Sequence, residues 1–120
     1  MEEGKEGKII EEIKNEILGK DYGLSFSFVD VEKIKELNKQ YRQKDEPTDI
    51  LSFSLDNECG EILICKEVAK KKAKEFYPDF QNYFLFLLIH GMFHLKGLNH
   101  GVKMEQYEHT YYSRYRHRHL

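Results

Sequence analysis

Three histidines lie within eleven residues, in the segment "HGMFHLKGLNH" that spans residues 90 to 100. His90 and His94 are four residues apart, so on an α-helix they project from the same face, one turn apart. Neutral imidazole nitrogens are good zinc ligands, and His100 would add a third from the loop that follows the helix. The spacing predicts a site for one zinc ion per chain, with the fourth tetrahedral position open to water.

Gly97 stands between the second and third histidines, where such a helix would end. Glycine readily adopts the left-handed conformation that terminates a helix and turns the chain back. Two histidines at this spacing are, by themselves, more typical of capping or packing. The glycine, the third histidine and the apolar run "YFLFLLI" at 83–89 together favour a metal. A structural metal is the less favoured alternative, because three-histidine sites without a thiolate are more often open and catalytic.

The same spacing occurs in the metzincin zinc proteases, whose helix reads HExxHxxGxxH and whose glutamate acts as general base. Gly91 occupies that glutamate's position here. A peptidase mechanism without this carboxylate loses a proton acceptor that contributes a factor of about 10² to 10⁴ in rate. A metallopeptidase of metzincin-like geometry is therefore an alternative function and not the favoured one.

The remaining segments predict an α+β fold in which a small mixed β-sheet packs against helices. The central helix, over about 79–96, is apolar on every side and carries His90 and His94. Strand-like alternation marks 24–30, and Asp56, Asn57 and Gly60 supply turn chemistry between two strands of a hairpin. The predicted hairpin strands are 50–54 and 61–65, and the other predicted helices cover 9–17, about 31–42, 66–77 and part of 103–120.

Asp30 is the expected N-cap of the second helix. The expected apolar stripe of that helix is Val31, Ile34, Leu37 and Tyr41, and Pro47 lies well beyond its end. Pro78 is expected to separate the third helix from the central one.

Composition predicts one globular domain over residues 1–120. Hydrophobic residues make up 40% of the chain and charged residues 33%, and the net charge of -2 gives no whole-molecule attraction to nucleic acid or to an anionic membrane. Cys59 and Cys65 form neither a CxxC pair nor a disulfide framework, which suits a reducing compartment. With no signal peptide or membrane anchor indicated, we expect a cytoplasmic protein, with a monomer favoured.

Three motifs resemble those of the YbeY family of bacterial metal-dependent endoribonucleases. Residues 90–100 match the family's HGxxHLxGYDH at all three histidines, both glycines and Leu95. The segment "LNKQYRQKDEPTDILSF" at 37–53 resembles LNxxYRxxDxPTDVLSF, and "GEILIC" at 60–65 resembles GDIVIC. Leu98 and Asn99 replace the family's Tyr-Asp, so an amide stands where the family has a carboxylate. We also expect the sheet to have one strand fewer than is usual in the family, because no strand is indicated before the first helix.

The resemblance implies cleavage of single-stranded RNA, maturation of ribosomal RNA at the small-subunit 3′ end, and ribosome quality control. It also implies that His90, His94 and His100 bind zinc and that these residues and Arg42 are catalytic. Judged from the residues alone, Arg42 would instead form an ion pair with Asp45 or Asp49. The guanidinium matches phosphate oxygens in shape, so its implied role is to hold the substrate.

A non-catalytic, metal-stabilised RNA-binding or ribosome-assembly module is a further alternative. It predicts RNA affinity without strand scission. Basic residues at 70–74 and at Arg114, Arg116 and Arg118 would follow an RNA backbone, although such charge runs are usually solvated helix faces. Tyrosines 111, 112 and 115 are expected to pack, with base stacking as the alternative.

Overall fold

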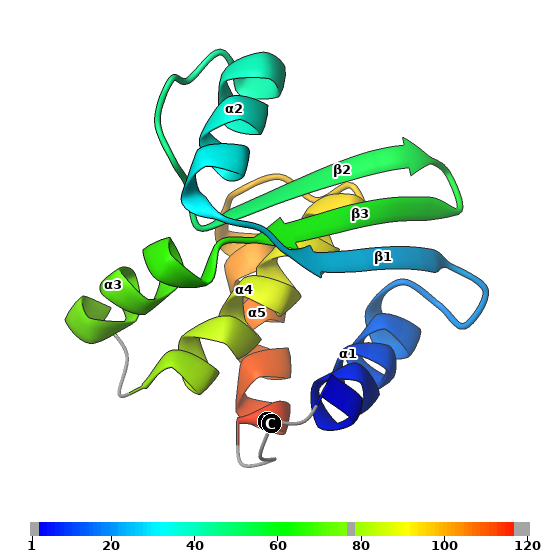
Figure 1. Cartoon of the computed structure of the whole chain (residues 1–120). Coiled ribbons are helices and arrows are strands. Elements are labelled where there is room, and N and C mark those ends of the chain that lie inside the picture. The colour runs from blue at the N-terminus through cyan, green and yellow to red at the C-terminus, as the bar shows by residue number, and fades with distance from the viewer. Residues whose placement is uncertain (1–2, 77–78, 117–120) are drawn as a thin grey trace.

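The computed structural model describes residues 3–76 and 79–116 (Figure 1). Its helices are α1 (Glu3–Ile17), α2 (Val31–Arg42), α3 (Lys66–Phe76), α4 (Phe80–Leu95) and α5 (Val102–Tyr115), and its strands are β1 (Gly23–Phe28), β2 (Ile50–Asp56) and β3 (Cys59–Ile64). The predicted α+β class is confirmed. Pro78 and the basic tail at 117–120 lie outside the described residues.

The three strands form a mixed sheet in the order β1-β3-β2. The central strand β3 pairs with β1 in parallel, with Phe26 opposite Ile62, and with β2 antiparallel, with Ile50 opposite Ile64. The predicted hairpin is confirmed, but its strands are longer than predicted. Its turn contains only Asn57 and Glu58, because the Asp56 carboxylate accepts a hydrogen bond from the Glu58 amide at 2.7 Å.

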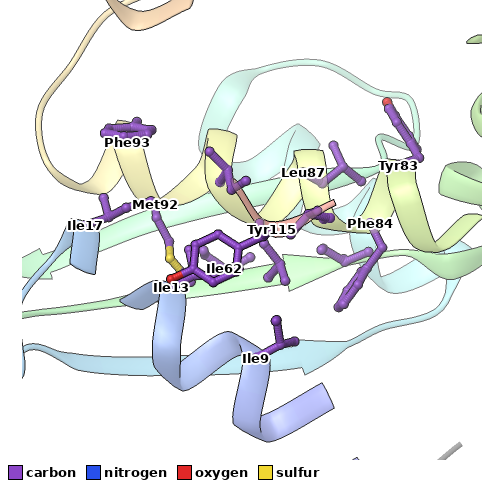
Figure 2. Packing of buried hydrophobic residues seen from close by; sticks show 14 of the residues in the cluster. Ile9, Ile13, Ile17, Ile62, Tyr83, Phe84, Leu87, Met92, Phe93 and Tyr115 are labelled. Carbon is purple, nitrogen blue, oxygen red and sulfur yellow. The ribbon is translucent and has the colours of Figure 1, made fainter. Parts of the chain in front are cut away.

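Helix α4 is the centre of the hydrophobic core, as its uniformly apolar sequence predicts. One face of the sheet packs on it through Ile62 and Ile64, and the apolar face of α1 closes the core from another side. Figure 2 shows Ile9 and Ile13 of α1 in the same cluster as Met92 and Tyr115. The isoleucines at intervals of four in α1 are thus core residues.

Helix α2 lies on the opposite face of the sheet from α4 (Figure 1). It packs through a second cluster that contains Ile34, Leu51 and Cys65. Asp30 caps it as predicted, and its side chain accepts a hydrogen bond from the Lys33 amide at 2.8 Å. The prediction that Tyr41 belongs to the buried stripe is wrong, because this side chain is 56% exposed. The helix ends one residue later, at Arg42, and the Tyr41 ring meets the Phe53 ring of β2 with centroids 5.0 Å apart, with much of its surface left exposed.

Candidate metal centre

The two helical histidines lie at the carboxyl end of α4, and the helix is held at both ends. Asp79 caps the start, where its carboxylate accepts a hydrogen bond from the Asn82 amide at 2.8 Å. The Nε2 atoms of His90 and His94 are 3.1 Å apart. One turn of a buried helix therefore presents two imidazoles with their nitrogens facing a common point.

The third histidine reaches the same point because the helix stops sharply. Gly97 has φ +103°, the amide of Leu98 donates to the Phe93 carbonyl at 3.0 Å, and the amide of Gly97 donates to the His94 carbonyl at 2.9 Å. This pair of bonds is a Schellman motif, which requires a left-handed residue at the position of the glycine. The chain then turns back, and one ligand atom from each of His90, His94 and His100 lies within 4.8 Å of the others.

The donor set fits a zinc ion. Zinc–nitrogen bonds of about 2.0 to 2.1 Å in a tetrahedron place two nitrogens about 3.3 Å apart, close to the separation of His90 and His94. Burial lowers the pKa of His94 from its ordinary value, and charge on His90 or His100 lowers it further. A lowered pKa keeps the imidazole neutral, which is the form that binds metal.

A buried carboxylate that the sequence analysis missed supports the first ligand. Glu108 of α5 is 8% exposed, and its Oε2 lies in hydrogen-bond contact with His90 Nδ1. Metal-binding histidines commonly donate their second ring nitrogen to such a group, which fixes the tautomer and the ring orientation. One signal was available, since Glu108 stands at helical spacing among Met104, Tyr111 and Tyr115, so a carboxylate interrupts an otherwise apolar stripe.

The backbone of the following loop supports the second ligand. His94 Nδ1 lies 3.2 Å from the carbonyl oxygen of Leu98. Asn99 stands next to the third ligand, and Glu108 provides a carboxylate from another direction. Asn99 carries an amide where the family motif has an aspartate, and the carboxylate in contact with a histidine of this centre is that of Glu108.

Gly91 does not face the metal centre. A Cβ atom built there would lie 3.1 Å from the Cδ1 atoms of both Ile50 and Ile62, which belong to the sheet. The close approach of α4 to the sheet therefore favours glycine at this position. A glutamate side chain would have to enter the core here, so the metzincin general base has no counterpart at this residue.

Arg42 and the three histidines line one pocket of about 570 Å³. Arg42 is in the last turn of α2 and exposed, whereas the histidines come from α4 and the loop after it. No carboxylate of the described residues lies within 4.0 Å of the Arg42 guanidinium. The ion-pair alternative is thus wrong for the described residues, because Asp45 lies 4.0 Å from Lys39 and Asp49 lies 3.4 Å from Lys72.

The loop between α2 and β2 is fixed by two buried polar side chains. Asn38 donates through its amide nitrogen to the Glu46 carbonyl at 2.8 Å. Asp49 accepts a hydrogen bond from the Tyr83 hydroxyl of α4, and its carbonyl accepts one from the Cys65 amide at 3.0 Å. These contacts tie the loop to α2, to α4 and to the residue that follows β3, which holds the end of α2 and Arg42 beside the histidines.

None of the helices in the described ranges is long and apolar enough to cross a membrane. The fold and site define an α+β protein with a three-histidine candidate metal centre at the end of a buried helix.

Comparisons with known proteins place this class within one family. The family model for endoribonuclease YbeY matches residues 4–115, and the chain belongs to the YbeY family. The endoribonuclease YbeY of Thermotoga petrophila is 40% identical over an alignment of 106 residues that covers 82% of this chain and 71% of that protein. The endoribonuclease YbeY of Staphylococcus carnosus is 36% identical over an alignment of 107 residues that covers 79% of this chain and 70% of that protein.

A solved structure gives the same result. The solution structure of TM1509 from Thermotoga maritima superposes with a TM-score of 0.66 at 33% sequence identity, over 92% of this chain and 78% of that chain. The resemblance seen in the sequence motifs is therefore confirmed by the family match and by relatives of similar sequence, and the solved structure has a similar fold.

Proposed function

We propose that this chain is a zinc-dependent endoribonuclease that hydrolyses phosphodiester bonds in single-stranded RNA. The observation that carries the proposal is the pocket that Arg42 shares with His90, His94 and His100. A guanidinium group and three imidazoles that could hold a metal ion, all in one pocket, suit a phosphodiester substrate. The family membership supports the same activity.

His90, His94 and His100 would hold the zinc ion. When bound, zinc supplies positive charge that polarises a phosphoryl oxygen and makes water a better nucleophile at neutral pH. Glu108 holds His90 in the tautomer that leaves Nε2 free for the metal. Arg42 binds the phosphate through two parallel N–H donors and stabilises the charge that develops on its oxygens.

Ribosomal RNA is the proposed substrate, with maturation of the small-subunit 3′ end and ribosome quality control as the proposed processes. These assignments, and cytoplasmic location, are carried by the resemblance to the YbeY family. A monomer remains the favoured state.

The metallopeptidase alternative is weakened by Gly91. A side chain at this position would point at Ile50 and Ile62 of the sheet and not at the metal centre. The assembly-module alternative is separated from the nuclease only by strand scission.

The test combines metal content and RNA cleavage. Untagged wild type, His94→Ala and the matched control His109→Ala are analysed by mass spectrometry and with a labelled single-stranded RNA. His109 is exposed on α5 and does not line the pocket. We expect one zinc per chain and cleavage in the wild type and in the control, and loss of both in His94→Ala.

Other outcomes contradict particular parts of the proposal. Bound zinc without cleavage would favour the assembly module, and cleavage of a peptide library in place of RNA would favour the peptidase. A wild-type chain that binds no metal would overturn the proposed metal centre.

A further inference from the structure

A second pocket adjoins the candidate metal centre on the outer face of the sheet. It has a volume of about 730 Å³, which is within the size range of small-molecule binding sites. Lys33, Leu37 and Tyr41 line it from one face of α2, at helical spacing. Phe53 and Leu55 of β2 and Glu61 and Leu63 of β3 line it from the sheet, and Figure 1 shows α2 over one end of that sheet.

The two pockets share a wall. Tyr41, Ser52 and Phe53 line both the outer pocket and the histidine pocket. Ser52 and Phe53 belong to β2, which is an edge strand, so the two pockets meet at the edge of the sheet. The outer pocket would therefore lie beside the groups next to a phosphate held at Arg42.

The shared wall is aromatic and accessible. The rings of Tyr41 and Phe53 meet edge to face with centroids 5.0 Å apart. Tyr41 is 56% exposed, and Leu55 further along β2 is 61% exposed. Exposed aromatic rings beside a phosphate site provide stacking surfaces for the bases of a single strand.

One carboxylate lies on the floor of the outer pocket. Glu61 of β3 is opposite Phe53 in the register of the hairpin and opposite Ser25 in that of the parallel pair. No cation of the described part of the chain lies within 4.0 Å of it, and Lys33 across the pocket pairs with Glu36 at 3.5 Å. An ionised carboxylate can only accept hydrogen bonds, so it favours a ligand that presents a hydrogen-bond donor.

We infer that the outer pocket binds the nucleobase next to the scissile phosphate, with Tyr41 as its stacking surface and Glu61 as acceptor for an exocyclic amino group. This inference rests on the proposed function and adds a substrate preference to it. Adenine, cytosine and guanine carry an exocyclic amino group and uracil does not, so uracil is the disfavoured base. The mixed lining of aromatic rings, hydroxyls and one carboxylate suits a base better than a purely apolar group.

The first test measures binding without cleavage. Nucleoside 5′-monophosphates and ribose 5-phosphate are titrated into the full chain, and amide resonances are followed by NMR. We expect AMP, CMP or GMP to shift the amides of Phe53 and Glu61, UMP to do so more weakly, and ribose 5-phosphate to leave them unchanged. Equal shifts with ribose 5-phosphate, or no shift with any nucleotide, would overturn the base pocket.

The second test uses variants. Tyr41→Ala should weaken CMP binding about tenfold, in the range expected for loss of one stacking partner. Glu61→Met should bring CMP and UMP to equal affinity. Matched controls are Tyr107→Ala, at an aromatic residue that is 40% exposed on α5, and Glu67→Met, at an exposed carboxylate on α3. Variants that bind all nucleotides as the wild type does would contradict the assignment.

Cleavage of RNA distinguishes this inference from the proposed function. If the chain binds nucleotides in the outer pocket but cuts no RNA, the proposed function is wrong and the base pocket is supported. If the wild type cuts RNA equally before every base and Tyr41→Ala is as active as the wild type, the base pocket is wrong and the proposed function stands.

Discussion

Glu108 and His90 come from different helices, and the carboxylate of one lies in hydrogen-bond contact with the Nδ1 atom of the other. The contact links α5 to α4 at the candidate metal centre. Since Glu108 is buried and His90 is half-buried, the carboxylate holds the imidazole more firmly than an exposed partner would.

Replacement of Glu108 by glutamine tests this link. The amide keeps the size of the side chain but loses the charge that supports the imidazole. We expect zinc affinity to fall by about 10- to 100-fold while the chain stays folded. The measurement is competition with a chelator, with circular dichroism to follow folding. Glu105→Gln is the control, because this exposed carboxylate lies on the same helix away from the histidines. Unchanged affinity in Glu108→Gln would show that the carboxylate does not support the metal.

Replacement of Arg42 tests phosphate binding. Arg42→Ala should reduce the rate of RNA cleavage by about 10² to 10³, as loss of a donor to developing charge does elsewhere. Arg42→Lys should recover only part of the rate, since a lysine cannot form the bidentate fork. Zinc content should not change in either variant. Lys35→Ala, an exposed cation on α2, is the control. Loss of zinc from Arg42→Ala would instead indicate a structural arginine.

Replacement of Gly97 tests the turn that positions His100. Any residue with a Cβ is strained at φ +103°, so Gly97→Ala should lower the free energy of unfolding by about 1 kcal/mol and should also weaken zinc binding. Gly7→Ala is a control of opposite sign, because Gly7 is exposed in α1 and alanine favours a helix. The measurement is chemical denaturation together with zinc titration. Wild-type zinc affinity in Gly97→Ala would mean that the third ligand does not depend on the turn.

Tyr115 gives a prediction at alkaline pH. Burial raises the pKa of the Tyr115 phenol, and its hydrogen bond to Glu16 raises it further. The phenol therefore ionises more readily in the unfolded chain, so its contribution to stability is complete below pH 10.0 and is lost as the pH rises above that value. Tyr115→Phe should be about 1 kcal/mol less stable at pH 7 and should lose less stability between pH 9 and about pH 11.

The measurement for Tyr115 is chemical denaturation across this pH range. Tyr107→Phe is the control, because the Tyr107 side chain is 40% exposed. If the wild type and Tyr115→Phe lose stability in parallel above pH 10.0, the buried phenol is not the responsible group.

The helical half of the histidine site could be predicted from the sequence because its determinants are local. The spacing of His90 and His94 and the glycine at 97 act within two turns of one helix. Glu108 could not be placed in the same way. Its role depends on how α5 packs on α4, and one charged residue in an apolar stripe gives little indication of its partner.

In the sheet, too, the features with local determinants could be predicted and those that join distant segments could not. The hairpin of β2 and β3 joins neighbouring segments and was predicted, although its turn was placed over too many residues. The parallel pairing of β1 with β3 connects segments more than thirty residues apart, with no local signal for the register. The exposure of Tyr41 was also missed, because an apolar stripe does not show where the surface that covers it ends.

The ion pair between Arg114 and Glu16 and the bond between Tyr115 and Glu16 join the last helix to the first. A chain under synthesis cannot form these contacts until α5 has left the ribosome. At an earlier stage it would carry all three histidines but neither Glu108 nor the contacts that α5 makes with Glu16 of α1. The metal centre of the nascent protein is therefore complete only after α5 has been synthesised. A chain that ended before α5 would have the three histidines without the carboxylate that supports His90.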